Sequence, residues 1–225
     1  MGTSSLSFVI PVLNEQDRLP HLLQDLRQRF PNSQLIVADG GSSDDSVKQA
    51  FGLCDQLLLS PPGRATQMNL GAQAATGDYL FFLHADSQLQ IEEGELVAAL
   101  GDKPEWGFCR VRLSGDGLAL RIISWFINLR STLTHVATGD QVLFVRRQLF
   151  ENSHGFDSIP LMEDVAYCKR LRKIVSPKVF ETPVITSSRR WREKGVLRTV
   201  LQMWALRFAY FCGVSPQRLW RFYYG

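Results

Sequence analysis

The most constraining stretch of this sequence runs from Asp78 to Ser87 and reads Asp-Tyr-Leu-Phe-Phe-Leu-His-Ala-Asp-Ser. Its apolar run, 79–83, is too short for an isolated helix and suits a strand that is buried on both faces. His84 and Asp86 follow two residues apart, so they point to the same side of an extended chain. Ligands bind at the carboxyl edge of open α/β sheets, which makes this pair a candidate site. The alternative is that Asp86 only caps the next turn.

Strands and helices alternate in the sequence before this stretch. Strands are predicted at 7–12, 34–38, 56–59 and 79–83, where apolar runs of strand length end in polar or turn residues. Helices are predicted between them: one with Leu19, Leu22, Leu23, Leu26 and Phe30 on one face, one with Val47 and Phe51, and one at 64–76. This order implies a mainly parallel sheet with helices on both faces. The chain lacks GxGxxG and the P-loop pattern, so dinucleotide dehydrogenases and P-loop NTPases lose their main support.

The composition limits the class of protein. The chain has 225 residues, of which 45% are hydrophobic and 21% charged, which fits one globular domain with an elaboration. The net charge of +3 is too small to indicate nucleic acid, and we expect no such partner. The segment 189–221 differs, since it carries seven Arg and one Lys against one acid, Glu193. Such a segment favours a phosphate-bearing substrate or a membrane surface.

Cysteine spacing and hydropathy indicate a cytoplasmic protein. Cys54, Cys109, Cys168 and Cys212 lie far apart, which argues for reduced thiols and against a structural zinc site. The sequence shows no secretory signal, and no apolar run approaches the ~20 residues of a membrane span. We therefore expect a cytoplasmic protein that is not integral to the membrane. Peripheral contact with the inner face of the membrane stays open.

The second predicted strand ends in Asp39-Gly40-Gly41-Ser42-Ser43-Asp44. The two glycines permit a tight turn, and Ser42 or Ser43 is suited to cap the helix that follows. An acidic residue at the end of such a strand binds the nucleoside in dinucleotide folds. An ordinary βα loop explains the same residues equally well.

Taken together, these residues resemble the inverting family 2 glycosyltransferases of the GT-A fold. The pieces that match, in order, are 9–15 (Val-Ile-Pro-Val-Leu-Asn-Glu), 39–44, 77–86, 139–141 (Gly-Asp-Gln) and 162–164 (Met-Glu-Asp). A similar variant is the bacterial subgroup called transferase 2, associated with radical-SAM and selenium-domain genes.

The resemblance implies an α/β fold of the Rossmann-like GT-A type, with a mainly parallel sheet and a C-terminal helical elaboration. It implies a nucleotide-diphosphate sugar that lies across the ends of the first, second and fourth strands. The donor-binding residues would be Pro11, Val12, Glu15, Asp39, Gly41, Ser42, Arg64, Asn69, Ala85 and Asp86. Asp86 matches the last Asp of the family's DxD motif, which binds Mn²⁺ or Mg²⁺ on the sugar diphosphate.

The sequence departs from the family pattern at two places near this site. His84 stands where DxD has its first Asp. It either ligates the metal, where imidazole suits Mn²⁺ better than Mg²⁺, or contacts ribose or phosphate. Residues 67–69 read Gln-Met-Asn where the family usually has Ala-Arg-Asn. Arg64 either supplies the missing cation to the diphosphate or is a solvated residue at a helix start.

The second half carries the acceptor-side residues. A strand is predicted at 107–113, a helix at 118–133, and a strand at 142–145. By resemblance, the preceding turn Gly139-Asp140-Gln141 binds sugar or acceptor hydroxyls. Asp164, supported by Glu163, would be the base that takes the acceptor proton. Both acids open a predicted helix, where stabilisation by the helix dipole alone would also explain them.

Two apolar helical stripes have two explanations each. Ile122, Trp125, Phe126 and Leu129 share a face of the helix at 118–133, and Leu197, Leu201, Trp204, Phe208 and Phe211 share a face of a helix at 196–213. We expect both stripes to pack into the core. The alternatives are a lipid-facing acceptor lip for the first and membrane docking for the second, which is followed by Trp220, Phe222, Tyr223 and Tyr224.

The C-terminal part carries one more motif. Residues 187–191 resemble QxxRW with Ser187 in place of Gln, which implies diphosphate and acceptor contacts for Arg190 and Trp191. The altered motif and the lack of predicted spans favour a single transfer over polymer synthesis. The predicted organisation is a GT-A domain at 1–185, with a nucleotide-sugar half (1–103) and an acceptor half (104–185), and a basic, aromatic helical segment at 186–225.

We therefore predict a metal-dependent, inverting glycosyltransferase. It would move one sugar from a nucleotide-diphosphate sugar, with UDP favoured by family frequency, to an unidentified acceptor; lipid, polyprenyl and carotenoid acceptors are candidates. Two rivals stay open. One is a nucleotidyltransferase of similar fold, which usually has a Gly-rich, basic first loop that 9–15 lacks. The other is a non-catalytic module that binds nucleotide sugars. The sequence leaves the sugar, the base and the oligomeric state undetermined.

Overall fold

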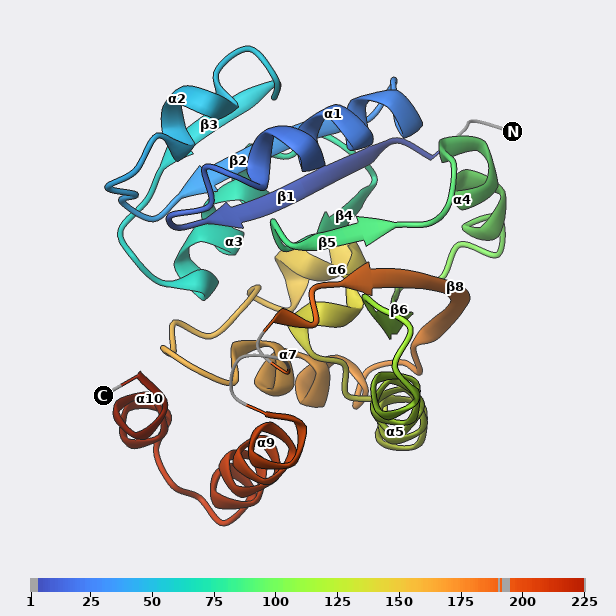
Figure 1. The fold of residues 1–225 in the computed structure, drawn as a ribbon. Coiled ribbons are helices and arrows are strands. Elements are labelled where there is room, and N and C mark those ends of the chain that lie inside the picture. The colour runs from blue at the N-terminus through green and yellow to red at the C-terminus, as the bar shows by residue number, and fades with distance from the viewer. Residues whose placement is uncertain (1–3, 190, 192–194, 225) are drawn as a thin grey trace.

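The computed structural model describes residues 4–189, 191 and 195–224 and arranges them around one eight-stranded sheet (Figure 1). The strand order is β3-β2-β1-β4-β7-β6-β8-β5. The first four strands of the chain are parallel, as predicted: β1 (Leu6–Val12), β2 (Gln34–Asp39), β3 (Gln56–Leu59) and β4 (Tyr79–Phe82). The carboxyl ends of β1, β2 and β4 therefore meet at one edge of the sheet, with β1 in the middle.

The sheet changes direction beside β4. There β7 (Leu143–Arg146) runs antiparallel to β4, and β6 (Trp106–Leu113) runs antiparallel to β7. Next, β8 (Lys178–Thr186) runs parallel to β6, and β5 (Ser87–Leu89) pairs antiparallel with β8 at the far edge. Residues 83–86 thus carry the chain from the middle of the sheet to a strand that is not a neighbour of β4.

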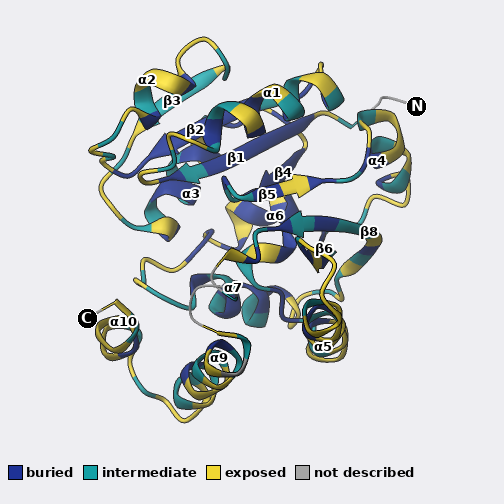
Figure 2. Ribbon diagram, viewed as in Figure 1, coloured by how far each residue is buried: buried dark blue, intermediate teal, exposed yellow. Residues whose placement is uncertain are grey.

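Helices cover both faces of the sheet, and the strands between them are mostly buried (Figure 2). One face packs against α1 (Leu19–Arg29), α2 (Ser46–Ala50) and α4 (Glu93–Ala99). The other packs against α3 (Arg64–Ala74), α6 (Arg147–Asn152) and α7 (Glu163–Leu171). The helix predicted from Leu19 onward is confirmed, because its apolar positions are the ones that α1 buries.

The central strand β4 is buried on both faces, as its apolar run predicts. The ring of Phe81 lies 5.4 Å from the rings of Phe8 and Phe144 in one core layer. The ring of Phe82 lies 4.8 Å from that of Phe156 in the other. Aromatic packing on both sides therefore fixes the strand that delivers His84 and Asp86.

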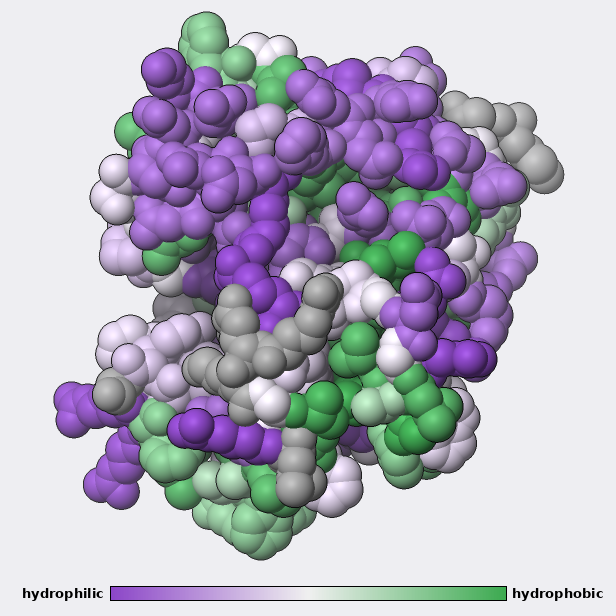
Figure 3. All heavy atoms as spheres, viewed as in Figure 1, coloured by the Kyte–Doolittle hydropathy of each residue, from purple (hydrophilic) through white to green (hydrophobic). Residues whose placement is uncertain are grey.

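The prediction that both apolar stripes pack into the core is wrong. On α5 (Leu118–Thr134), Trp125 is 57% exposed and Phe126 is 54% exposed, and Ile122 and Leu129 are exposed as well. On α9 (Val196–Phe211), the exposed members are Leu201, Trp204, Phe208 and Phe211. Helical spacing identifies residues that share a face, but it does not identify what covers that face. These helices and α10 (Pro216–Tyr224) lie at one end of the molecule, the lower end in Figures 1 and 3.

Over the residues that the structure describes, no helix combines the length and the apolar character that a bilayer-crossing segment needs.

Candidate active site

The loops that follow β1 and β2 are joined by hydrogen bonds. The Asn14 N–H donates to Ser42 Oγ at 2.9 Å, and Asn14 Oδ1 accepts the Ser43 N–H at 2.9 Å. The Glu15 N–H donates to Ser46 Oγ at 2.8 Å. Asn14 has a φ of 56°, a left-handed conformation that asparagine tolerates better than most residues. These hydrogen bonds hold the two loops together at the edge of the sheet, and loops that are fixed in this way favour a binding role.

Asp39 ends β2 and is 2% exposed. Its Oδ2 accepts the N–H groups of Gly41 and Ser42 at 2.9 Å each, and its Oδ1 accepts the Ser42 hydroxyl at 2.5 Å. Gly41 has a φ of 91°, which favours glycine. The carboxylate therefore organises its own βα loop, the plainer of its two explanations. Nucleoside contact by Asp39 stays a prediction.

Gln67 shapes the site, and the sequence prediction missed it. It is 4% exposed, and its Nε2 donates to the carbonyl oxygens of Val12 at 2.7 Å and Ala38 at 2.8 Å. One buried amide thereby joins the carboxyl ends of β1 and β2 to α3. Gly40 leaves room for the Gln67 side chain, because a Cβ at this position would lie 2.9 Å from Gln67 Cδ. The signal in the sequence is the spacing of Gln67 from Gly71, which places both on the inner face of α3.

His84 follows β4 in a nearly closed environment. Its side chain is 16% exposed, and burial, together with the charge of Arg64, lowers its pKa to about 3. The imidazole is therefore neutral near pH 7. Its Nδ1 lies 4.0 Å from Oδ1 of Asp140, and a Cβ on Gly139 would lie 2.3 Å from its Cε1. A neutral imidazole held in this way can exchange hydrogen bonds with a ligand or bind a metal.

Asp86 provides the carboxylate at the same edge. It is half-buried, and a hydrogen bond from Ser87 Oγ to its Oδ1 is long, 3.5 Å. Ala85 is buried between the two polar residues. Within the described ranges, no three His, Cys, Asp or Glu side chains gather closely enough to hold a metal ion by themselves. A divalent cation at Asp86, with His84 as a second candidate ligand, therefore stays a prediction, and such a cation would need further oxygen ligands from a bound molecule or water.

Asp164 lies in the first turn of α7. Its Oδ2 accepts the Gly139 N–H at 2.7 Å, and its Oδ1 accepts the Val165 N–H at 2.6 Å. Burial, and then the negative charge of Glu163, raise the pKa of Asp164 to about 6, against the opposing effect of those two hydrogen bonds. A carboxyl that titrates near neutrality is suited to take a proton from a substrate.

Glu163 and Arg64 form an ion pair beside Asp164. Glu163 is buried, and its Oε1 lies 3.4 Å from Nη1 of Arg64. Desolvation of the guanidinium by the surrounding protein lowers the pKa of Arg64, but the carboxylates of Glu163, Asp164 and Asp140 outweigh this effect and raise it. The Arg64 side chain is 43% exposed, so it can also meet an anionic ligand.

Arg64, His84, Gly139, Glu163 and Asp164 line one narrow crevice. It combines a guanidinium, a neutral imidazole and a carboxyl of raised pKa, the groups that acid–base chemistry on an anionic substrate needs. A larger hollow of about 550 Å³ lies between α1 and the residues before β3, away from these groups.

Comparison with known sequences decides the family. A model of glycosyl transferase family 2 matches residues 7–145, from β1 into β7, which is more than half of the chain. The chain belongs to glycosyl transferase family 2. The match ends before α7, so the roles of Glu163 and Asp164 stay predictions.

Curated relatives align with part of this family 2 chain. A 4,4'-diaponeurosporenoate glycosyltransferase of Staphylococcus haemolyticus is 33% identical over 98 residues, 40% of this chain and 26% of that protein. An undecaprenyl-phosphate 4-deoxy-4-formamido-L-arabinose transferase of Proteus mirabilis is 34% identical over 112 residues, 44% of this chain and 34% of that protein. The alignments thus span well under half the length of these relatives.

Solved structures extend the likeness across the fold. A glucosyl-3-phosphoglycerate synthase of Mycobacterium tuberculosis, solved with Mn²⁺, UDP-glucose and phosphoglyceric acid, has a TM-score of 0.64 at 18% identity and covers 94% of this chain and 80% of its own. A mannosyltransferase of Pyrobaculum calidifontis, solved with GDP-Man and Mn²⁺, has a TM-score of 0.63 at 17% identity. The match covers 93% of this chain and 62% of that protein. The predicted α/β fold of the GT-A type is confirmed.

Two predicted ligand-binding amides of this family 2 chain form hydrogen bonds with the chain itself. Gln141 is fully buried, and its Nε2 donates to Ser131 Oγ at 2.8 Å. The side-chain amide of Asn69 pairs with both backbone groups of Phe156, at 2.8 and 2.9 Å. Contact of either amide with a sugar would require these bonds to break. The Asp140 side chain, in contrast, is 55% exposed.

Three of the other predicted residues lie at or just after the end of β1. Pro11 is half-buried and Val12 is buried at the end of β1, and the Glu15 carboxylate pairs with Arg18 at 2.9 Å. Trp191 is half-buried. Arg190 lies outside the described residues.

Proposed function

We propose that this family 2 chain is an inverting, metal-dependent glycosyltransferase that moves one sugar from a nucleotide-diphosphate sugar, with UDP preferred, to an acceptor hydroxyl. Asp164 carries the proposal: a carboxyl with a pKa near 6, held by two N–H groups, in the same crevice as Arg64 and His84. Inversion in one step needs one base, and Asp164 supplies it. Within the family, we assign the chain to the transferase 2 subgroup associated with radical-SAM and selenium-domain genes.

The proposed reaction is a single displacement. The acceptor oxygen attacks the anomeric carbon, its proton passes to the Asp164 carboxylate, and the bond from the anomeric carbon to the diphosphate oxygen breaks. The configuration inverts because the entering and leaving oxygens lie on opposite faces of the sugar. Arg64 stabilises the charge that grows on the leaving nucleoside diphosphate, and Glu163 orients Arg64 and keeps the pKa of Asp164 high.

The nucleotide would lie over the joined loops at the ends of β1 and β2. Asp86, with His84 as the second candidate, would hold a divalent cation, which when bound supplies charge neutralisation at the diphosphate. The solved neighbours that contain Mn²⁺ support metal use and leave the choice between Mn²⁺ and Mg²⁺ open.

For the acceptor, we propose a lipid of the polyprenyl or carotenoid class that carries a hydroxyl group, at the cytoplasmic face of a membrane. The support is the lipid class in the names of two curated relatives, which are named for undecaprenyl phosphate and 4,4'-diaponeurosporenoate. Those names specify a phosphate and a carboxylate, so they support the lipid class and not the hydroxyl.

Nucleotide binding is the first test of this function. At a hundredfold over its dissociation constant, a ligand of the folded state adds ~2.7 kcal/mol of stability. In a melting panel of UDP, GDP, CMP and dTDP, each with Mn²⁺, Mg²⁺ or chelator, we expect UDP with metal to raise the Tm. Asp86→Ala should lose the metal-dependent part. Asp102→Ala, which removes a carboxylate that is 81% exposed, should keep it.

Two outcomes would count against the proposal. A panel in which no nucleotide changes the Tm contradicts the donor site. Metal-dependent stabilisation without turnover on any acceptor supports the non-catalytic binding module instead.

The pH profile tests the base. Asp164 acts only when ionised, and its raised pKa of about 6 means that kcat/KM should be level above pH 7 and fall about tenfold per pH unit below pH 6. Rates of nucleoside diphosphate release between pH 4.5 and 8.5 would measure this fall of kcat/KM on the acid side. A profile that stays level through pH 5, with the enzyme still folded, contradicts the assignment.

A further inference from the structure

The proposed chemistry leaves one large surface unused. The structure exposes 17 large hydrophobic side chains among the described residues, of which six lie on α5, four on α9 and three on α10. We call these 13 side chains the apolar face. Figure 3 shows hydrophobic surface gathered over α5 and α9, whereas the opposite end of the molecule is mostly hydrophilic. An apolar surface of this extent on a folded chain marks an interaction site.

The charge of the same helices has one sign. The sequences of α5, α9 and α10 contain no Asp or Glu. They contain six arginines: Arg121, Arg130, Arg198, Arg207, Arg218 and Arg221. Four of these are exposed: Arg121, Arg198, Arg218 and Arg221. A partner for this face must therefore be apolar and negatively charged at once.

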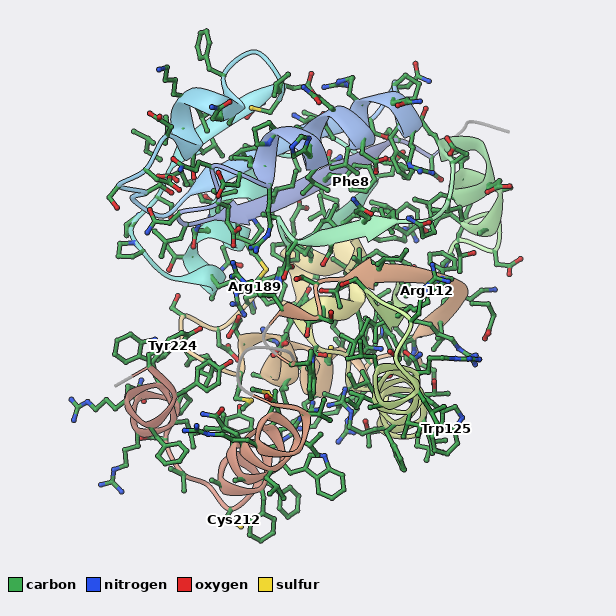
Figure 4. All side chains as sticks on the ribbon, in the orientation of Figure 1. Phe8, Arg112, Trp125, Arg189, Cys212 and Tyr224 are labelled. Atoms are coloured by element: carbon green, nitrogen blue, oxygen red, sulfur yellow. The ribbon has the colours of Figure 1, made fainter. Side chains whose placement is uncertain are left out.

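An anionic bilayer meets both conditions. Its headgroups attract arginine, and its boundary with the acyl chains accepts aromatic side chains. Eight of the 13 side chains are Trp, Phe or Tyr, and Trp and Tyr are enriched at that boundary. A second copy of the chain meets only one condition, because two such faces would bring arginine against arginine. In Figure 4, Trp125 lies on the outer side of α5, and Cys212, which directly follows α9, lies at the lower end of the molecule, away from the sheet.

The apolar face adjoins the crevice at two points. α5 ends at Thr134, and the chain then runs through Thr138 to Gly139, whose N–H holds Asp164. At the other point, Tyr224 of α10 lies in the neighbourhood of Arg64, which lines the crevice. A surface bound to this face would therefore lie beside the acceptor side of the crevice.

We propose that α5, α9 and α10 dock the protein on an anionic lipid bilayer, with the aromatic side chains at the level of the headgroups. This docking rests on the face itself. Its use, to present a lipid acceptor to Asp164, rests on the proposed function.

Vesicle binding tests the proposal. In flotation assays, the protein should bind vesicles of phosphatidylcholine with about one third phosphatidylglycerol at least tenfold more tightly than vesicles of phosphatidylcholine alone, and added salt should weaken this binding. The double variant Trp204→Glu/Phe208→Glu should lose at least tenfold of this affinity. Its matched control is Phe51→Glu, which alters a side chain that is 82% exposed outside the apolar face and should bind as the wild type does.

Three results would overturn the docking. They are no binding of the wild type to anionic vesicles, an equal loss in Phe51→Glu, and a dimer by light scattering that the double variant abolishes while vesicles go unbound. An unchanged circular dichroism spectrum and a cooperative melting transition would show that the variant is folded. Vesicle binding uses neither donor nor turnover, so its failure is distinguishable from failure of the glycosyltransferase proposal.

Discussion

Asp164→Asn should lower kcat by ~10²- to 10⁴-fold and leave the affinity for nucleotide unchanged. Asparagine has nearly the same shape, and its one side-chain oxygen can still accept the Gly139 N–H that Asp164 accepts at 2.7 Å. Its Nδ2 then faces the Val165 N–H, which loses its side-chain acceptor. The substitution therefore removes the base and keeps the anchor of the turn. The measurement is release of UDP from a UDP-sugar in the presence of a bacterial lipid extract, with nucleotide affinity taken from melting shifts.

Stability gives this variant a second readout. The folded-state pKa of Asp164, about 6, lies above the ordinary value of 3.8, so the protonated carboxyl stabilises the folded state and its ionisation opposes folding. The stability that the protonated form contributes is complete below pH 3.8 and is lost as the pH rises through about 6. Because asparagine does not titrate, the Tm of Asp164→Asn relative to that of the wild type should be higher at pH 7.5 than at pH 4.5. The control Asp102→Asn, at a carboxylate that is 81% exposed, should change neither rate nor Tm. Full activity in Asp164→Asn would mean that Asp164 is not the base and only stabilises the start of α7.

The parallel half of the fold was predictable because its signals are local. A strand buried on both faces must be a continuous apolar run, and β1, β2 and β4 are such runs. The polar residues that end these runs fall at one sheet edge by topology alone. That edge could therefore be predicted, and with it the placement of Asp39 and Asp86.

The internal bonds of the site were not predictable, because they join distant segments. Nothing local distinguishes Gln67, which joins two strand ends, from Asn69, which holds the Phe156 backbone. The motif around Gln141 suggests a residue that binds sugar, whereas in the structure its buried amide donates a hydrogen bond to Ser131. An amide side chain carries no mark of whether its partner is a ligand or the chain itself.

The prediction that the apolar stripes on α5 and α9 pack into the core failed for a different reason. Apolar spacing on a helix reports that a face avoids water, and a protein core, a second copy and a bilayer all provide that. The sequence did contain a discriminating feature, since core helices have no need for the six arginines that these helices and α10 carry. The absence of acids there, read together with the stripe, points away from the core.

Gly139→Ala should lower kcat/KM by about 100-fold, because it disturbs two site residues at once. The new Cβ would lie 2.3 Å from Cε1 and 2.6 Å from Nε2 of His84, well inside van der Waals contact. Either the imidazole leaves its nearly closed place, or the turn shifts and carries with it the N–H that holds Asp164. Overpacking of this kind also costs ~1–3 kcal/mol of folding free energy, which melting would detect.

Gly94 offers a matched control for this prediction. It lies in α4 with open space where a Cβ would be, so Gly94→Ala should leave activity intact and raise stability by about 0.4–1 kcal/mol. His84→Ala combined with Gly139→Ala should recover the stability lost in Gly139→Ala, because removal of the ring frees the space that the methyl group needs. Activity should not recover, since the imidazole is gone. Recovery of both would mean that His84 only fills space beside Gly139, and a Gly139→Ala protein with normal Tm and rate would contradict the packing itself.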